Sequence, residues 1–361
     1  MSAAITIAID AMSGDDGPEI VVPAALAFLQ KNKTFDIILV GNQDKLEALL
    51  LLNLECISPE KSSNLSSDQS TDLSTEKKLA NTSVTIVHAD TVVAMDERPS
   101  RALRKKQDSS MAIALGLVRD GRADACVSAG NTGALMMMGR SILRMYPGID
   151  RPAITKLFPS QGGGCFVLDL GANVDSSSEH LLQFALMGQL LAQAIKKVDK
   201  PKVALLNVGG ESIKGNEQVR LAATLIEECE AVNYVGFVEG GDIFRSVADV
   251  IVCDGFVGNV ALKSAEGAVQ IILNGVKAFF AETWYKKLIG RLLLPWLAKS
   301  LKQLDPETHN GAIFLGLQGV LVKSHGSASS ASFEHAIDLA AKEAQANLPA
   351  LINSQLEEVL F

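Results

Sequence analysis

A turn that could bind an anion lies near the middle of the chain, between an apolar run that ends at Val127 and a helix-length apolar run from Ala134 to Leu143. Its small and polar residues are Ser128, Gly130, Asn131, Thr132 and Gly133. Because glycine and asparagine tolerate positive φ, the pattern predicts a tight strand-to-helix turn. Such a turn points backbone N–H groups into one space at the positive end of a helix, where an anion can bind. An ordinary helix start remains the alternative, since the turn lacks the Lys-Ser/Thr ending of a P-loop and the three-glycine dinucleotide spacing.

Four further segments repeat this pattern of an apolar run followed by glycine, asparagine and charged residues. They are Leu168–Asn173, Leu205–Glu217, Val250–Asn259 and Lys323–Ser329, and the last contains His325. In an open parallel sheet such turns emerge at the carboxyl edge, where ligands bind. The repetition therefore predicts one active site that several turns share.

Two features that precede the central turn are further candidates. Asp10 follows a predicted strand, Ile5–Ile9, and could act as a base or orient a cation. Lys105 lies in a cationic stretch before a helix that begins near Ser109 and Ser110, and cations with helix-start hydroxyls suit a phosphate. A solvated charged loop with an ordinary helix cap explains the second feature equally well.

Residues 269–304 form a basic, aromatic segment with six cations and one acid, which gives it a net charge of +5. The residues in it that suit a membrane surface or a dimer interface are Trp284, Tyr285, Lys286, Lys287, Arg291 and Trp296. Gly290 and Pro295 divide it into helical pieces. An amphipathic basic helix with aromatic residues is typical of an anionic membrane surface. A helical pair at a dimer interface is the alternative, and the two can coexist.

The elements that position these turns follow the order of an α/β protein. Apolar runs predict strands at 5–9, 35–40, 84–88, 124–128, 153–158, 165–170, 202–207, 233–237, 249–253 and within 311–322. Helical patterns fall at 18–30, 43–52, 134–143, 179–197 and 217–229, and a last one ends near 346. The aromatic content of 5% favours a core of small aliphatic residues, as in parallel sheets. We expect a single large α/β catalytic domain over residues 1–361, with the polar, serine-rich stretch 53–82 as a flexible insertion.

Composition excludes several classes of protein. The net charge of −8 argues against a general nucleic-acid binder. The five cysteines include no C-x-x-C pair, so we expect buried thiols in a reducing compartment. No basic segment precedes the first apolar run and no stretch of about 18 uncharged apolar residues occurs, so we expect neither a signal peptide nor a membrane span.

Taken in order, the motifs DAMSGDDGP, SAGNTGA, LDLGANVD, LNVGGESIKGNE, DGFVGNVALKSAEG and KSHGSAS resemble the acyl-[acyl carrier protein]:phosphate acyltransferases of bacterial phospholipid synthesis. The resemblance covers the chain except 53–82. It implies a Rossmann-like α/β/α sandwich with a mostly parallel sheet, similar to phosphate acetyltransferases and isocitrate/isopropylmalate dehydrogenases. It also implies a cytoplasmic homodimer at the membrane periphery, without metal or nucleotide cofactor, that passes acyl phosphate to a membrane glycerol-3-phosphate acyltransferase.

The implied chemistry assigns roles to the candidate residues. The central turn, with Lys105, Ser109 and Ser110, would hold phosphate. Lys214 is the first choice to stabilise the oxyanion formed on the thioester carbon. Asn173, Asn216, Asn259 and Lys263 could add donors, Asp10 and Asp254 could orient the lysines, and His325 could shuttle a proton. A coenzyme A-dependent phosphate acetyl- or butyryltransferase is the alternative function, and the basic aromatic segment argues against so soluble a substrate.

Overall fold

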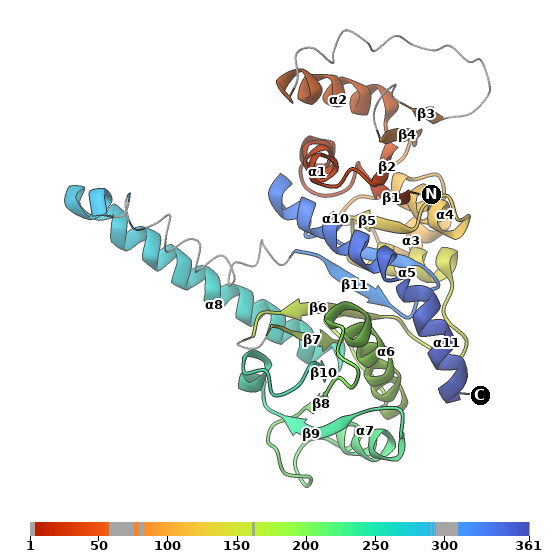
Figure 1. Ribbon diagram of the computed structural model, residues 1–361, viewed down its shortest axis with the longest axis vertical. Coiled ribbons are helices and arrows are strands. Elements are labelled where there is room, and N and C mark those ends of the chain that lie inside the picture. Colours follow the sequence, from red (N-terminus) through yellow and green to blue (C-terminus); the bar gives the residue numbers. More distant parts are fainter. Residues whose placement is uncertain are drawn as a thin grey trace. The chain divides into compact units, whose positions relative to one another are not determined.

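The computed structural model describes residues 4–57, 76–78, 83–160, 163–289, 291, 293 and 310–360. The chain divides into two compact units (Figure 1). Unit 1 comprises Met1–Pro152, Ala194–Lys196 and Asn310–Phe361, and unit 2 comprises Ala153–Gln193 and Lys197–His309. The expectation of a single catalytic domain stays a prediction.

The strands of unit 1 lie in the order β3-β4-β2-β1-β5-β12-β11. Their bounds are β1 Ile5–Asp10, β2 Phe35–Gly41, β3 Glu76–Lys78, β4 Val84–His88, β5 Ala125–Ser128, β11 Ala312–Leu315 and β12 Val320–Lys323. The central pairs from β4 to β12 are parallel, and β3 and β11 pair antiparallel at either end.

Helices cover both faces of the unit 1 strands. One core cluster joins alternate strand residues such as Ile7, Ile37 and Val127 to the helices α1 Pro18–Lys31, α2 Gln43–Ile57 and α10 Ser330–Gln345. The intervening strand residues are also buried, and Leu321 packs toward Gly139 of α5 Thr132–Leu143. The remaining helices are α3 Pro99–Lys105, α4 Ser110–Arg119 and α11 Leu348–Leu360. Burial on both faces explains why the strands are apolar throughout rather than alternating.

Unit 2 has the strand order β6-β7-β10-β8-β9. The strands are β6 Ala153–Phe158, β7 Cys165–Leu168, β8 Val203–Leu206, β9 Tyr234–Val238 and β10 Val250–Val252. Only the β6–β7 hairpin among these described pairs is antiparallel. The helices are α6 Ser178–Lys196, α7 Glu217–Glu228, the short 3-10 helix η2 Gly240–Phe244 and α8 Gly255–Ala281. The mostly parallel α/β class predicted from the sequence is thus confirmed in both units.

The structure departs from the predicted elements in several places. Helix α2 continues to Ile57 and residues 76–78 form strand β3, so parts of the predicted insertion 53–82 are regular. Residues 58–75 and 79–82 lie outside the described residues, and the flexibility of the insertion stays a prediction. The cationic stretch before Ser109 is a helix, α3, rather than a loop. Cys126, Cys165 and Cys253 are buried, as expected.

Helix α8 is buried only at its start, at Gly255 and Gly258, and extends away from the strands of its unit (Figure 1). Apolar side chains along it and beyond it face solvent, among them Ile271, Phe279 and Trp284. Tyr285, Lys287 and Arg291 are exposed as well, whereas Trp296 lies outside the described residues. Within the described part of the chain, no helix is long and apolar enough to span a bilayer.

One buried carboxyl makes the stability of unit 1 depend on pH. Glu343 on α10 is fully buried, and neither carboxyl oxygen has a hydrogen-bond partner among the described residues. Burial raises the pKa of Glu343 well above its ordinary value. Because the folded-state pKa exceeds the unfolded-state value, the stability that Glu343 contributes is complete below the unfolded pKa and is lost as pH rises through the folded one.

We expect Glu343→Gln to stabilise the protein increasingly above the unfolded-state pKa, by about 1.4 kcal/mol per pH unit until the folded pKa is reached. Thermal midpoints of both proteins, measured from pH 5 upward, check this. Asp338→Asn, on an exposed ion pair of the same helix, is the control and should show no such trend. Parallel curves for wild type and Glu343→Gln would contradict the expectation.

Candidate functional site

Three parallel strands of unit 1 end together and bring three chemically active residues to one edge. Asp10 on β1 is in register with Ser128 on β5, and Ser128 is in register with Lys323 on β12. The loops that follow these strands contact one another, since the Asp15 N–H donates to the Gly326 carbonyl over 2.9 Å. The sequence motifs DAMSGDDGP, SAGNTGA and KSHGSAS therefore meet at one place.

Asp10 is a fully buried anchor beneath the central turn. Its Oδ2 accepts hydrogen bonds from the hydroxyls of Ser13 and, over 2.8 Å, Ser128. Burial raises the pKa of Asp10, and the surrounding serine hydroxyls oppose that rise. Ser128 Oγ also accepts the Gly130 N–H over 3.1 Å. Both Asp10 and Ser128 thus tie the turn to the end of β1, which places them under the candidate anion site rather than open to a ligand.

The side chain of Asn131 is fully engaged in the structure. Its Oδ1 caps α5 by accepting the Ala134 N–H over 3.0 Å, and its Nδ2 donates to the carbonyls of Met95 and Glu97. What the turn offers an anion is its backbone, because the first N–H groups of a helix have no intrahelical acceptor. These N–H groups belong to Thr132, which is exposed, and to Gly133.

The basic stretch meets this turn at the start of α3, and a role of Lys105 in binding phosphate stays a prediction. Pro99, at the start of α3, packs against Gly133, but Lys105 ends α3 about 9 Å further along the helix axis. Ser109 caps α4 by accepting the Ala112 N–H and itself donates to the Lys106 carbonyl. Ser110 is fully buried near Asp10, and its hydroxyl opposes the rise that burial causes in the pKa of Asp10. The Ser109 hydroxyl is therefore engaged in the helix start, and a role of Ser109 and Ser110 in binding phosphate stays a prediction.

Lys323 is a cation at this edge that the sequence analysis did not single out. Its Nζ donates to the carbonyl of Ala129 over 3.2 Å and to that of Ser324. Ala129 belongs to the central turn, so Lys323 is held beside the N-terminus of α5. Its position at the end of an apolar run, in the same motif as His325, was the signal available in the sequence.

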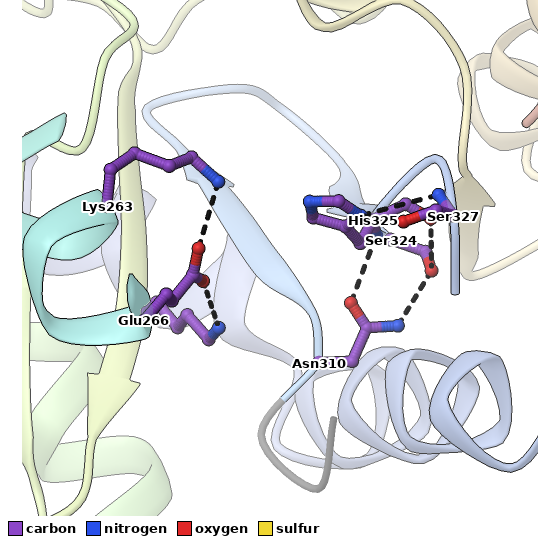
Figure 2. A network of polar contacts seen from close by, with 7 residues as sticks. Lys263, Glu266, Asn310, Ser324, His325 and Ser327 are labelled. Atoms are coloured by element: carbon purple, nitrogen blue, oxygen red, sulfur yellow. Dashed lines mark hydrogen bonds and ion pairs between the residues drawn. The ribbon is translucent and has the colours of Figure 1, made fainter. Parts of the chain in front are cut away.

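His325 lies two residues beyond Lys323 in an exposed loop that buried Asn310 supports (Figure 2). The His325 N–H donates to Asn310 Oδ1 over 3.0 Å, and Asn310 Nδ2 donates to Ser324 Oγ and to the Ser332 carbonyl. The ring accepts at Nδ1 from the Ser327 N–H over 3.3 Å. The loop is thereby fixed on both sides of the histidine.

Asp169 organises the equivalent edge of unit 2. It follows β7, is fully buried, and accepts N–H groups from Ile154, Gly171, Ala172 and Asn173 over 2.7–3.2 Å. Asn173 Nδ2 also donates to Asp169 Oδ2 over 3.0 Å. Burial raises the pKa of Asp169, and these N–H groups counteract it. Asn173, predicted as a catalytic donor, is thus bound to the carboxylate that shapes its own turn.

The start of α8 packs directly on this turn. Asp254 caps α8 by accepting the Val257 N–H over 2.9 Å. Gly255 donates its N–H to the Asn173 carbonyl, and a Cβ at Gly258 would collide with the Asp169 carbonyl. Asn259 lies over Gly171, with its Cβ 3.5 Å from where a Cβ of Gly171 would be. The motifs LDLGAN and DGFVGN therefore form one compact structure, and Asn173, Asp254 and Asn259 lie together on it.

The loop after β8 has its own internal contacts. Lys214 is exposed and pairs with Glu211 over 2.8 Å, which raises the pKa of Lys214. Asn216 caps α7 by accepting the Val219 N–H, and Asn207 Nδ2 donates to the Lys214 carbonyl. The predicted oxyanion cation is therefore a member of a neutral, solvent-exposed ion pair.

Lys263 is exposed and belongs to a cluster on unit 2 with the more enclosed Lys156 and Glu266. Its Nζ lies 2.9 Å from one oxygen of Glu266, and the other oxygen lies 3.4 Å from Lys156 Nζ on β6 (Figure 2). Burial lowers the pKa of Lys156, and contacts with the two lysines outweigh burial to lower that of Glu266. Two ammonium groups share one carboxylate, so the cluster keeps a charge of +1. Among the described residues, no group of three or more His, Cys, Asp or Glu side chains could hold a metal.

Solved structures identify the class of fold. The chain matches a phosphotransacetylase from Streptococcus pyogenes with a TM-score of 0.60 and 18% identity, over 96% of this chain and 95% of that chain. It matches a branched-chain phosphotransacylase from Enterococcus faecalis with a TM-score of 0.54 and 15% identity, over 94% of this chain and 99% of that chain. The molecule is therefore an α/β protein with the fold of the phosphotransacetylases.

Sequence relatives are much closer. The family model described as "Fatty acid synthesis protein" matches residues 64–351. A phosphate acyltransferase from Marinobacter nauticus is 51% identical over 99% of this chain and 97% of the relative, and one from Pseudomonas fluorescens is 48% identical over both full lengths. The chain belongs to this fatty acid synthesis family of phosphate acyltransferases and is an acyltransferase enzyme.

Proposed function

We propose that the chain transfers a fatty acyl group from the thioester of acyl carrier protein to inorganic phosphate, for phospholipid synthesis. The observation that carries the proposal is the shared register of Asp10, Ser128 and Lys323. It sets a lysine beside open N–H groups at the N-terminus of α5, a combination that suits phosphate. The names of the close relatives favour this reaction over the coenzyme A-dependent alternative, because the solved phosphotransacetylases support the fold alone.

In this proposal phosphate binds to the backbone of Thr132 and Gly133, with Lys323 as the cation. A phosphate oxygen attacks the thioester carbon, the carbonyl oxygen becomes negatively charged, and the thiolate leaves as the C–S bond breaks. Lys105 is the weaker candidate for the phosphate because it ends α3 away from Pro99.

The developing oxyanion needs a fixed donor or cation. Lys214 and Lys263 are the candidate cations, with Asn173, Asn216 and Asn259 as further donors. We favour Lys263, because its cluster with Lys156 and Glu266 retains positive charge, whereas Glu211 neutralises Lys214; the two lysine side chains are similarly exposed, at 55% and 45%.

Purified protein, long-chain acyl carrier protein, phosphate and hydroxylamine test the proposal directly, because hydroxylamine traps acyl phosphate as a hydroxamate. We expect a signal that requires both acyl carrier protein and phosphate. A signal with acyl-coenzyme A but none with acyl carrier protein would favour the alternative donor. Absence of signal with either donor would overturn the proposed function.

We also propose that the basic segment 269–304 contacts an anionic membrane surface and pairs two copies of the chain in a homodimer. Exposed Trp284 and Tyr285 suit the lipid headgroup region, and Lys286 lies 4.3 Å from the centre of the Phe279 ring. This placement at the cytoplasmic face of the membrane would bring the acyl phosphate to a membrane glycerol-3-phosphate acyltransferase.

Replacing Trp284 and Tyr285 together with alanine is expected to reduce binding to anionic vesicles about 100-fold or more, because each large aromatic side chain loses roughly 1.5 kcal/mol or more of apolar burial. Vesicle sedimentation at low and physiological salt measures this. Leu52→Ala, which removes an exposed apolar side chain from α2, is the matched control and should bind normally. Equal sedimentation of all three proteins would remove the basis of the membrane proposal.

A further inference from the structure

The loop between β12 and α10 makes hydrogen bonds to the His325 ring that select one tautomer. The backbone N–H of Ser327 points at Nδ1 over 3.3 Å, and Ser327 Oγ lies 2.9 Å from the same nitrogen. A backbone N–H can only donate, so Nδ1 must be the acceptor and carry no proton. In the neutral ring the proton therefore resides on Nε2.

The contacts of the loop fix the position of His325. Helix α10 begins at Ser330, five residues after the histidine, with Ser329 as its cap. Asn310 is 8% exposed and fixes the loop through three hydrogen bonds, to the His325 N–H, to Ser324 Oγ and to the Ser332 carbonyl. The ring is therefore positioned before any substrate arrives.

We propose that His325 is a hydrogen-bond donor to an anionic substrate oxygen through Nε2–H, and that it does not carry a proton between substrates. The reason is chemical. A neutral imidazole that gave up its Nε2 proton while Nδ1 accepts from Ser327 would become an imidazolate, which is far too basic to form at neutral pH. The proposal replaces the proton-shuttle role expected from the sequence.

This inference rests on the proposed acyl transfer and specifies one of its steps. A bond forms between a phosphate oxygen and the thioester carbon, and the carbonyl π electrons move onto the carbonyl oxygen. As the C=O bond re-forms, the C–S bond breaks and its electrons leave with the sulfur as a thiolate, which takes up the proton that the attacking phosphate loses. The Nε2 proton stays on nitrogen throughout, donating either to that carbonyl oxygen or to an oxygen of the phosphate. A preorganised donor of this kind stabilises charge without being consumed.

The protonation state can be measured without any activity. Protein labelled with ¹⁵N-histidine contains five histidines, and the spectrum of His325→Gln assigns the His325 signals. His180 is an internal reference, because its Nδ1 accepts the Ser177 N–H over 3.2 Å. At assay pH we expect an unprotonated Nδ1 and a protonated Nε2 for His325, in wild type and in Ser327→Ala, which keeps the backbone donor. A proton on Nδ1, or on both nitrogens, would overturn the proposal.

Activity supplies the second readout. Loss of a fixed donor in His325→Ala should lower kcat/KM roughly 100-fold, whereas His325→Gln, which keeps an N–H donor, should stay about tenfold above the alanine variant. A loss confined to KM for phosphate assigns the bond to phosphate, and a loss in kcat assigns it to the carbonyl oxygen. Equal activities of the glutamine and alanine variants would overturn the donor role. An inactive wild type would refute the proposed function and leave the measured tautomer standing.

Discussion

Replacing Gly258 with alanine is expected to lower the unfolding free energy of unit 2 by about 3 kcal/mol, because overpacking of this kind typically costs that much at its upper end. The added Cβ would collide with the carbonyl of Asp169 and lie 3.0 Å from the sulfur of Cys253. Backbone atoms cannot rotate aside as a flexible side chain can, so α8 would have to move off the Asp169 turn. We expect a fall in both the calorimetric midpoint and the rate of acyl transfer.

Gly267→Ala is the matched control on the same helix. Nothing lies within 4 Å of a Cβ at Gly267, so alanine should stabilise α8 by roughly 0.5–1 kcal/mol through its higher helix propensity. Opposite signs for the two substitutions would establish that close packing, rather than a general need for glycine in α8, joins the two motifs. Equal midpoints for both variants would show that α8 does not pack on the Asp169 turn.

The substitution Asp169→Asn is expected to have the larger effect on the site itself. The carboxylate accepts N–H groups at both oxygens, so either orientation of an amide would turn its NH₂ toward N–H donors. Each buried N–H left without an acceptor costs about 1–3 kcal/mol, and at least two would be lost, so we expect about 4 kcal/mol of destabilisation. Calorimetry and amide hydrogen exchange at Ala172 and Asn173 measure it.

Asp254→Asn tests whether the effect belongs to the buried carboxylate. Asp254 is only partly buried and accepts the Val257 N–H as a helix cap, a task that asparagine performs about equally well. We expect its stability to stay within about 0.5 kcal/mol of wild type. Comparable destabilisation at both positions would mean that charge loss at this edge, rather than the lost acceptors of Asp169, is responsible.

The sequence predicted the fold well where a residue pattern is compatible with only one kind of secondary structure. Apolar runs such as Val84–His88 and Ala153–Phe158 became strands with the predicted bounds, because sheets covered on both faces require continuous apolar strands. The polar turns after the strands that end at Asp10, Ser128 and Lys323 share one edge, as parallel pairing requires. Helix α3 was missed because its seven residues are too short and too charged to show an apolar period.

Individual side-chain roles were harder to predict, because they depend on which partner each polar group finds. Asn131 lies in a turn typical of ligand binding, but its side chain caps α5 and donates to two backbone carbonyls. Lys214 lies in a conspicuous motif but pairs with Glu211 three residues away. Asn310 supports His325 through its side-chain amide, although the two residues are 15 positions apart. A contact of this kind leaves no periodic pattern in the sequence, so it could not be predicted.

The central claim is that phosphate itself is the acyl acceptor, and isotope transfer tests it most directly. Phosphate fully labelled with ¹⁸O, incubated with long-chain acyl carrier protein and the enzyme, should give acyl phosphate that retains all of the label when analysed by mass spectrometry. Retention requires a phosphate oxygen to have attacked the thioester carbon. Release of free fatty acid without any labelled acyl phosphate would show that water is the acceptor and would contradict the account.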